Sequence, residues 1–140
     1  MFHWVDLRTF CYATEERERV EQALRFASGG DIRSTTAESH YGNPLLLLGS
    51  RLDTAEAIVA CWNRIVTRDV AAVWREHLED RVDDSNVFHA RLDKQEAYHE
   101  RFVAARSADV IDLTAKVRAY PAKRETALAL LREDLDRRCN

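Results

Sequence analysis

Two stretches of the chain alternate between apolar and polar residues, which is the pattern of a β-strand with one covered face. The first runs from His3 to Tyr12 and the second from Ile111 to Tyr120. A shorter alternation, from Val87 to Leu92, predicts a third strand of this kind. In all three, one set of alternate positions is apolar and the other is mostly polar. The pattern predicts a sheet that is packed on one side and open on the other.

A run of leucines, Leu45–Leu48, follows the turn signal Gly42-Asn43-Pro44. Glycine and asparagine tolerate the positive φ of a tight reversal, and proline fixes its own φ. An apolar run without alternation indicates a strand buried on both faces, although a helix is also compatible with it. We favour a strand because Gly49 ends the run at once. With the polar segment Arg33–Glu38 before it, the run predicts a hairpin whose second strand is central and whose first strand lies nearer an edge.

Apolar residues recur at helical spacing in three other segments. One follows Thr14, a good N-cap residue, and ends at Gly29. Residues 53–78 predict a long helix with a break near Thr67, or two helices. The last helix follows Pro121, and its apolar stripe comprises Ala127, Leu128, Leu131 and Leu135. The order of strands and helices lacks regular βαβ units and therefore predicts an α+β fold, with a mostly antiparallel sheet, helices packed on one face and a C-terminal helix.

The length of 140 residues predicts one domain, residues 1–120, with a helical extension over residues 121–140. No apolar run approaches the length of a membrane span. The first residues lack the basic and apolar regions of a signal peptide. The three cysteines are far apart and form no CxxC pair, which indicates reduced thiols in a cytoplasmic protein.

The net charge of −3 gives no global attraction for nucleic acid. Basic residues nevertheless fall on the polar side of the predicted strands: Arg8, Arg91, Lys116 and Arg118. Trp4 and Phe10 lie among them. Cations neutralise phosphates and aromatic rings stack on bases, so such a face is one way to bind RNA. A surface for a protein partner and a plain solvated surface fit the same pattern.

Motifs of known enzyme classes do not occur in the sequence. It contains no HExxH, GxSxG, Walker A or GxGxxG motif, and the five histidines are isolated. Cys11 falls on the inward side of the first strand, where a structural thiol is the simpler interpretation than a nucleophile. We therefore predict no catalytic residue, no metal site and no cofactor.

Four short motifs resemble an archaeal family of small RNA-binding proteins. In chain order they are Val5-Asp6-Leu7-Arg8, Thr14-Glu15-Glu16, Tyr41-Gly42-Asn43-Pro44-Leu45 and Leu92-Asp93-Lys94-Gln95-Glu96-Ala97-Tyr98. The similarity spans roughly residues 2–120, and the extension from Pro121 is typical of only some members. The family is described as a predicted exosome subunit and is related in fold to the ribosomal protein L5 domain. The resemblance implies an L5-like α+β fold, RNA binding without catalysis, and the exosome or other RNA-processing proteins as partners.

Further candidate contacts to RNA follow from the turn and from the third strand. His40, Tyr41 and Asn43 are expected at the tip of the hairpin, unless that turn is purely structural. Lys94 and Gln95 follow a strand end, where an ammonium and an amide can reach phosphate or a 2′-hydroxyl group. Tyr98 either stacks on a base or belongs to the core.

An alternative function is that of a protein–protein adaptor. The stripe Leu128, Leu131 and Leu135 could dock on a neighbouring protein as well as on its own sheet. The sequence is also compatible with a homo-oligomer.

Overall fold

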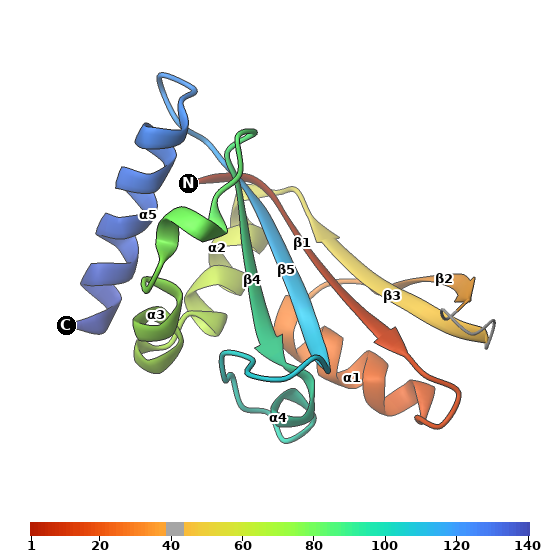
Figure 1. Ribbon diagram of the computed structural model, residues 1–140. Helices are drawn as coiled ribbons and strands as arrows, with labels where there is room; N and C mark the ends of the chain where they lie inside the picture. The colour runs from red at the N-terminus through yellow and green to blue at the C-terminus, as the bar shows by residue number, and fades with distance from the viewer. Residues whose placement is uncertain (39–43) are drawn as a thin grey trace.

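The computed structural model describes residues 1–38 and 44–140, so the predicted tip residues His40, Tyr41 and Asn43 lie outside the described residues. The described elements follow the predicted order, and the structure adds a 3₁₀ turn before the strand predicted at Val87–Leu92 and a short helix after it (Figure 1). They are β1 (Phe2–Cys11), α1 (Arg17–Ser28), β2 (Arg33–Glu38), β3 (Pro44–Leu52), α2 (Ala55–Ile65), α3 (Arg68–Trp74), η1 (Leu78–Arg81), β4 (Val87–Asp93), α4 (Lys94–Tyr98), β5 (Val110–Val117) and α5 (Arg124–Cys139).

The five strands form one sheet in the order β2-β3-β1-β5-β4, and all neighbours are antiparallel. The antiparallel α+β prediction is therefore confirmed. The leucine strand β3 lies inside the sheet, between β2 and β1, and β2 lies at an edge as predicted. The central strand, however, is β1 and not β3. The prediction was wrong because the sequence did not reveal that β5 returns to pair with the first strand.

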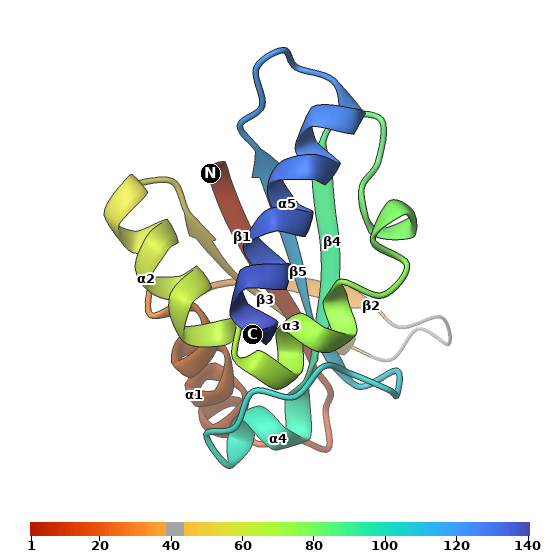
Figure 2. The same cartoon turned by 90° about the vertical axis from the view of Figure 1, so that its left-hand side faces the viewer.

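The helices cover one face of the sheet, and α3 and α5 lie in front of the strands when the molecule is viewed from that side (Figure 2). Only one face of β3 is covered. Leu48 is 0% exposed and pairs with Thr9 on the helix side, whereas Leu46 and Leu47 are half-buried. Leu47 points to the uncovered side. Burial of the whole leucine run was therefore a wrong prediction. Leu45 is buried like Leu48, but Leu46 and Leu47 are not, and no helix or second sheet of the described residues covers the side that Leu47 faces.

The core beneath the helices is centred on four aromatic rings from four elements. The Trp62 ring of α2 lies 4.7 Å from Phe2 and 5.9 Å from Phe88, centroid to centroid. Trp74 of α3 lies 5.7 Å from Phe88. The break between α2 and α3 falls where it was predicted, because the Thr67 side chain accepts a hydrogen bond from the Val70 amide and begins a new helix.

The ends of α1 show one confirmed and one wrong prediction. Gly29 ends the helix with a φ of 71°, a conformation that glycine adopts without steric cost. The N-cap is Glu16 and not Thr14. The neighbouring Glu15 side chain is held by Lys94 and Tyr98, and the helix begins only after this contact.

The C-terminal helix α5 packs on the body of the chain. Leu131 and Leu135 are fully buried, and the indole Nε1 of Trp62 donates a 2.8 Å hydrogen bond to the Asp134 carboxylate. The stripe is thus used within the chain, which contradicts docking of the same leucines on a neighbour. The helix begins at Arg124, later than Pro121 suggested. Across the described residues, no helix combines the length and the apolar character needed to span a bilayer.

Candidate nucleic-acid interface

The uncovered face of the sheet carries basic side chains from all five strands. Strand pairing places alternate residues of each strand on this face. Its described outward positions include five basic residues: Arg8, Arg33, Arg51, Arg91 and Lys116. We call this set the basic face. The acidic residues at outward positions are Asp6, Asp93 and Asp112, and each accepts a hydrogen bond within the chain.

Three arginines of the basic face lie on one row across the sheet. Arg91 pairs in register with Asp112, and Asp112 pairs with Arg8. Beyond Arg8 the row continues through Gly49 to Arg33. Neighbouring strands are about 4.8 Å apart, so successive arginines of this row start roughly 10 Å from one another. Such a row can contact more than one phosphate of a bound strand.

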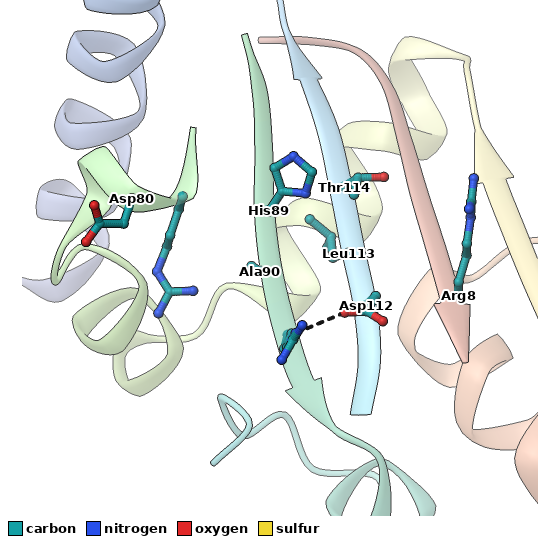
Figure 3. A pocket seen from close by; sticks show the side chains of 9 residues that line it. Arg8, Asp80, His89, Ala90, Asp112, Leu113 and Thr114 are labelled. Carbon is teal, nitrogen blue, oxygen red and sulfur yellow. Dashed lines mark hydrogen bonds and ion pairs between the residues drawn. The ribbon is translucent and has the colours of Figure 1, made fainter. Parts of the chain in front are cut away.

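A hollow of about 520 Å³ lies over the part of this row from Arg91 to Arg8, between β1 and the 3₁₀ turn η1 (Figure 3). Arg8 borders it on β1 and Asp80 borders it beyond the edge strand β4 (Figure 3). The Arg91 Nε donates a 3.1 Å bond to Asp112 on its floor. Both partners of this ion pair are at least half exposed, so the pair contributes little to stability and leaves the remaining guanidinium donors accessible. The hollow therefore offers cations at an open, water-filled surface.

Arg81 of η1 also lines the hollow. Burial lowers the pKa of its guanidinium, which stays charged because arginine titrates far above neutral pH. Its Nε is buried and has no hydrogen-bond partner within the described residues. A buried donor without a partner is costly, and an anion in the hollow is one group that can satisfy it.

Arg51 and Lys116 lie at the other end of the basic face. The Arg51 guanidinium stacks 4.4 Å from the Trp4 ring centroid, which holds a flexible cation in a defined place. The Lys116 ammonium donates to the carbonyl oxygen of Ser85. Arg118 is exposed one residue beyond β5, where its amide donates to the Met1 carbonyl. Arg8, Arg91, Lys116 and Arg118 are thus on or beside the face on which they were predicted.

Lys94 is not at this surface, and its expected position as an exposed cation at a strand end was wrong. Its side chain is 1% exposed, and its ammonium donates to the Phe10 carbonyl at 2.9 Å and to the carboxylates of Glu15 at 2.8 Å and Asp109 at 2.9 Å. These bonds use all three ammonium donors. Lys94 therefore connects the end of β1, the approach to α1 and the start of β5.

Lys94, Glu15 and Asp109 form a group that we call the Lys94 cluster. Electrostatic interactions within it keep all three side chains charged. Burial alone would lower the pKa of Lys94, but its bonds to Glu15 and Asp109 raise that pKa overall. Burial would likewise raise the pKa values of Glu15 and Asp109. The hydrogen bonds that these carboxylates accept, from Lys94 in both cases, lower both pKa values overall.

Gln95 and Tyr98 also belong to the Lys94 cluster. The Gln95 amide donates to Asp109 at 2.8 Å, and the Tyr98 hydroxyl donates to Glu15 at 2.6 Å. Burial and the contact with Glu15 raise the pKa of Tyr98. The Tyr98 ring is partly buried and packs on the core, in line with the interpretation of Tyr98 as a core residue and not as a stacking partner for a base. The Arg19 guanidinium lies over the ring.

Comparison with known proteins now defines the family. A family model described as RNA binding matches residues 4–117. The chain belongs to this RNA-binding family. An RNA-binding protein of Pyrococcus abyssi is 30% identical, and the alignment covers 96% of this chain and 94% of that protein. The predicted resemblance to small archaeal RNA-binding proteins is confirmed, and family membership supports an RNA-binding function.

Solved structures of the family share the fold. A protein of Archaeglobus fulgidus from the DUF54 family is 31% identical with a TM-score of 0.87, over 95% of this chain and 99% of that one. A DUF54 protein of Methanothermobacter thermautotrophicus is 34% identical with a TM-score of 0.82, over 96% and 98% of the two chains.

Sequence reasoning missed Arg33, Arg51 and Arg81. The positions of Arg33 and Arg51 follow from alternation along the hairpin strands, a signal that the unbroken leucine run obscured. Arg81 lies between the helical segment 53–78 and the strand that begins at Val87, and nothing in the local sequence indicates that it borders the sheet. Within residues 1–38 and 44–140, no group of three or more His, Cys, Asp or Glu side chains is arranged to hold a metal ion.

Proposed function

We propose that this chain is a non-catalytic RNA-binding protein that holds RNA on its basic face. The observation that carries the proposal is the row of Arg91, Arg8 and Arg33 across the uncovered side of the sheet. The net charge of the chain is negative, so binding must depend on this local surplus of cations. The family description supports RNA as the ligand.

The proposal is tested by measuring how binding depends on salt. Fluorescence anisotropy of a labelled single-stranded oligoribonucleotide gives Kd at several salt concentrations. About four phosphate contacts imply a log–log slope near −3, at roughly −0.7 per contact on a single strand. Replacing Arg51 and Arg91 by Gln should reduce the magnitude of the slope by about 1.4 and weaken binding at every salt concentration.

The matched control replaces Arg25 and Arg68 by Gln. Both are exposed on the helical side, and neither forms a side-chain ion pair within the described residues. The control should keep the affinity and the slope of the wild type. Equal losses in both double variants would exclude the basic face as the site, and absence of wild-type binding at low salt would refute the proposal.

We extend the proposal to the exosome, which the resemblance to the family implies as a partner. Affinity capture of the tagged chain from its own cells, with and without ribonuclease, tests this extension. Exosome subunits that persist after digestion indicate a direct contact, and subunits that disappear indicate a bridge of RNA. Their absence from both samples would remove the exosome from the proposal.

A further inference from the structure

Two aromatic side chains project from the end of β1 beside the basic face. Phe10 is 42% exposed and Tyr12 is 44% exposed. They are two residues apart in the chain, with Tyr12 just beyond the end of β1, and their ring centroids lie 6.4 Å from each other with 39° between the ring planes. Single exposed apolar residues are ordinary on protein surfaces. Two adjacent exposed rings next to a row of arginines form a more specific surface.

Each side of this aromatic pair borders a hollow that contains an arginine. The first hollow, of about 240 Å³, contacts both rings and is lined by Arg91, Asp109 and Asp112. The second, of about 230 Å³, contacts Tyr12 and is lined by Arg17 together with Leu45 and Leu46 of β3. A base that covers one of the rings would therefore have a guanidinium nearby for its phosphate.

Both carboxylates that line the first hollow accept hydrogen bonds from cationic partners within the chain. Asp112 accepts from Arg91, and Asp109 accepts from Lys94 and Gln95. Repulsion of a phosphate at this end of the sheet is therefore reduced. Only the contact with Asp109 comes from the Lys94 cluster, so this buried cluster affects the charge of the surface without being exposed there.

The Lys94 cluster also holds the Tyr12 ring in place. The Lys94 ammonium lies 5.1 Å from the ring centroid, and the Tyr12 amide donates a 3.1 Å bond to Glu15. A ring that is fixed before binding loses less conformational entropy when a base stacks on it. The exposed rings are thus preorganised on a rigid support.

We propose that Phe10 and Tyr12 form a stacking platform for two neighbouring unpaired bases, which makes single-stranded RNA the ligand of the basic face. This inference rests on the proposed RNA-binding function and specifies its substrate. Bases within a duplex are stacked on both sides and offer only edges and backbone to a protein. Rings that lie on a sheet surface can stack only on bases that have left a helix. Arg91 would contact the adjacent phosphate, whereas Arg17 is already paired with Glu21 and Ser34.

The test compares three labelled ligands of equal length by fluorescence anisotropy: a single-stranded oligouridine, the same ribose-phosphate strand without bases, and an RNA duplex. The wild-type protein should bind the oligouridine at least tenfold more tightly than the abasic strand, because one stacked base contributes about tenfold or more. The duplex should bind with an affinity close to that of the abasic strand, since both offer mainly phosphates.

The Phe10→Leu, Tyr12→Leu double variant should bind the oligouridine and the abasic strand within twofold of each other. Its affinity for the abasic strand and its salt slope should equal those of the wild type, since no cation is lost. Tyr120→Leu is the control, because Tyr120 is 82% exposed but lies beyond the far end of β5. It should keep the preference for bases.

The wild-type measurements decide the question even if the double variant folds poorly. Equal wild-type affinity for all three ligands would overturn the stacking platform and leave RNA binding by the basic face intact. A preference for bases that survives in the double variant would also overturn it. Absence of binding to any of the three ligands would overturn the proposed function itself.

Discussion

Lys94 is the residue on which the junction of β1, α4 and β5 depends. Its ammonium has three acceptors, and two of them are carboxylates from segments far away in the sequence. A buried charge is tolerated only when it is paired and hydrogen-bonded. Glu15 and Asp109 are in turn paired with Lys94. Removal of the ammonium would therefore leave two carboxylate charges without an ion-pair partner.

Replacing Lys94 by Met should therefore destabilise the fold by about 3 kcal/mol, the usual cost of breaking a buried ion pair. Urea denaturation followed by circular dichroism measures the loss. Lys123→Met is the control, because Lys123 is exposed and makes no side-chain capping bond at the start of α5. A Lys94 variant as stable as this control would show that the buried pair contributes nothing.

The pKa shifts of the same cluster predict a plateau of stability between acid and alkaline pH. Glu15 and Asp109 have folded-state pKa values below their ordinary 4.5 and 3.8, so their stabilisation is present above those values and is lost as pH falls through the folded pKa values. Lys94 has a pKa above 10.5, so its stabilisation is present below that value and is lost as pH rises through the folded pKa.

We expect the free energy of unfolding to be nearly constant from about pH 5 to about pH 9 and to fall on both sides, because burial also raises the pKa values of the Cys11 and Cys61 thiols above their ordinary 9.0. Other carboxylates, such as Asp134, also have lowered pKa values and contribute to the acid limb. The difference between the wild type and Glu15→Gln isolates this cluster. Denaturation between pH 3 and pH 10 should show a smaller acid loss in the variant, and identical acid limbs would contradict the assignment.

At the scale of elements, strand β3 illustrates how position within a sheet differs from burial. The strand has neighbours on both edges, but helices of the described residues cover only one of its faces. Leu48 lies under α1 and the core, whereas Leu47 faces the uncovered side between Phe10 and Thr35 of the adjacent strands. The four leucines of the run Leu45–Leu48 are chemically identical, but they contribute unequally to the free energy of unfolding.

We expect Leu48→Ala to cost about 3 kcal/mol and Leu47→Ala about 1 kcal/mol, because a fully buried leucine leaves a cavity and a half-buried one leaves a shallow depression. Thermal and chemical denaturation of the two variants provides the measurement, and each variant is the control for the other. Equal losses at both positions would mean that the uncovered face is covered in solution.

At the scale of the whole molecule, α5 completes the core. Ala127, Leu131 and Leu135 are fully buried, and Asp134 anchors the helix to Trp62 and so to the aromatic cluster. An isolated helix of this length is marginal in water, so packing and not propensity holds it in place. Residues 121–140 contribute to the same hydrophobic core as the strands.

Ending the chain after Tyr120 should remove several buried side chains, each of which contributes about 2 kcal/mol to the free energy of unfolding. Together they are a large share of the roughly 5–15 kcal/mol that is typical of a whole domain. The melting temperature should fall sharply or cooperative unfolding should disappear. Leu131→Ala should reproduce part of the loss, whereas Leu130→Ala, at a 36% exposed position of the same helix, should cost far less. An unchanged melting temperature of the truncated chain would contradict this role.

The sequence by itself determined the kinds and the order of the elements. Periodicity is a local property, so alternation marked β1, β4 and β5, and a change in the phase of the apolar stripe marked the break near Thr67. Gly29 marked the end of α1. It also determined which side of those strands is polar, and with it the positions of Arg8 and Arg91 on the basic face. The family followed from short motifs, which are local as well.

Only the tertiary structure decided which of these residues meet. Glu15 and Lys94 are 79 residues apart in the chain and Phe10 and Lys94 are 84 apart, so no local pattern shows that Lys94 is buried among them. The same reason explains why β1 and not β3 is central, and why Arg33 joins the row of Arg8 and Arg91. Register across strands is set by pairing between distant segments, and a basic surface exists only after that pairing brings its charges to one side.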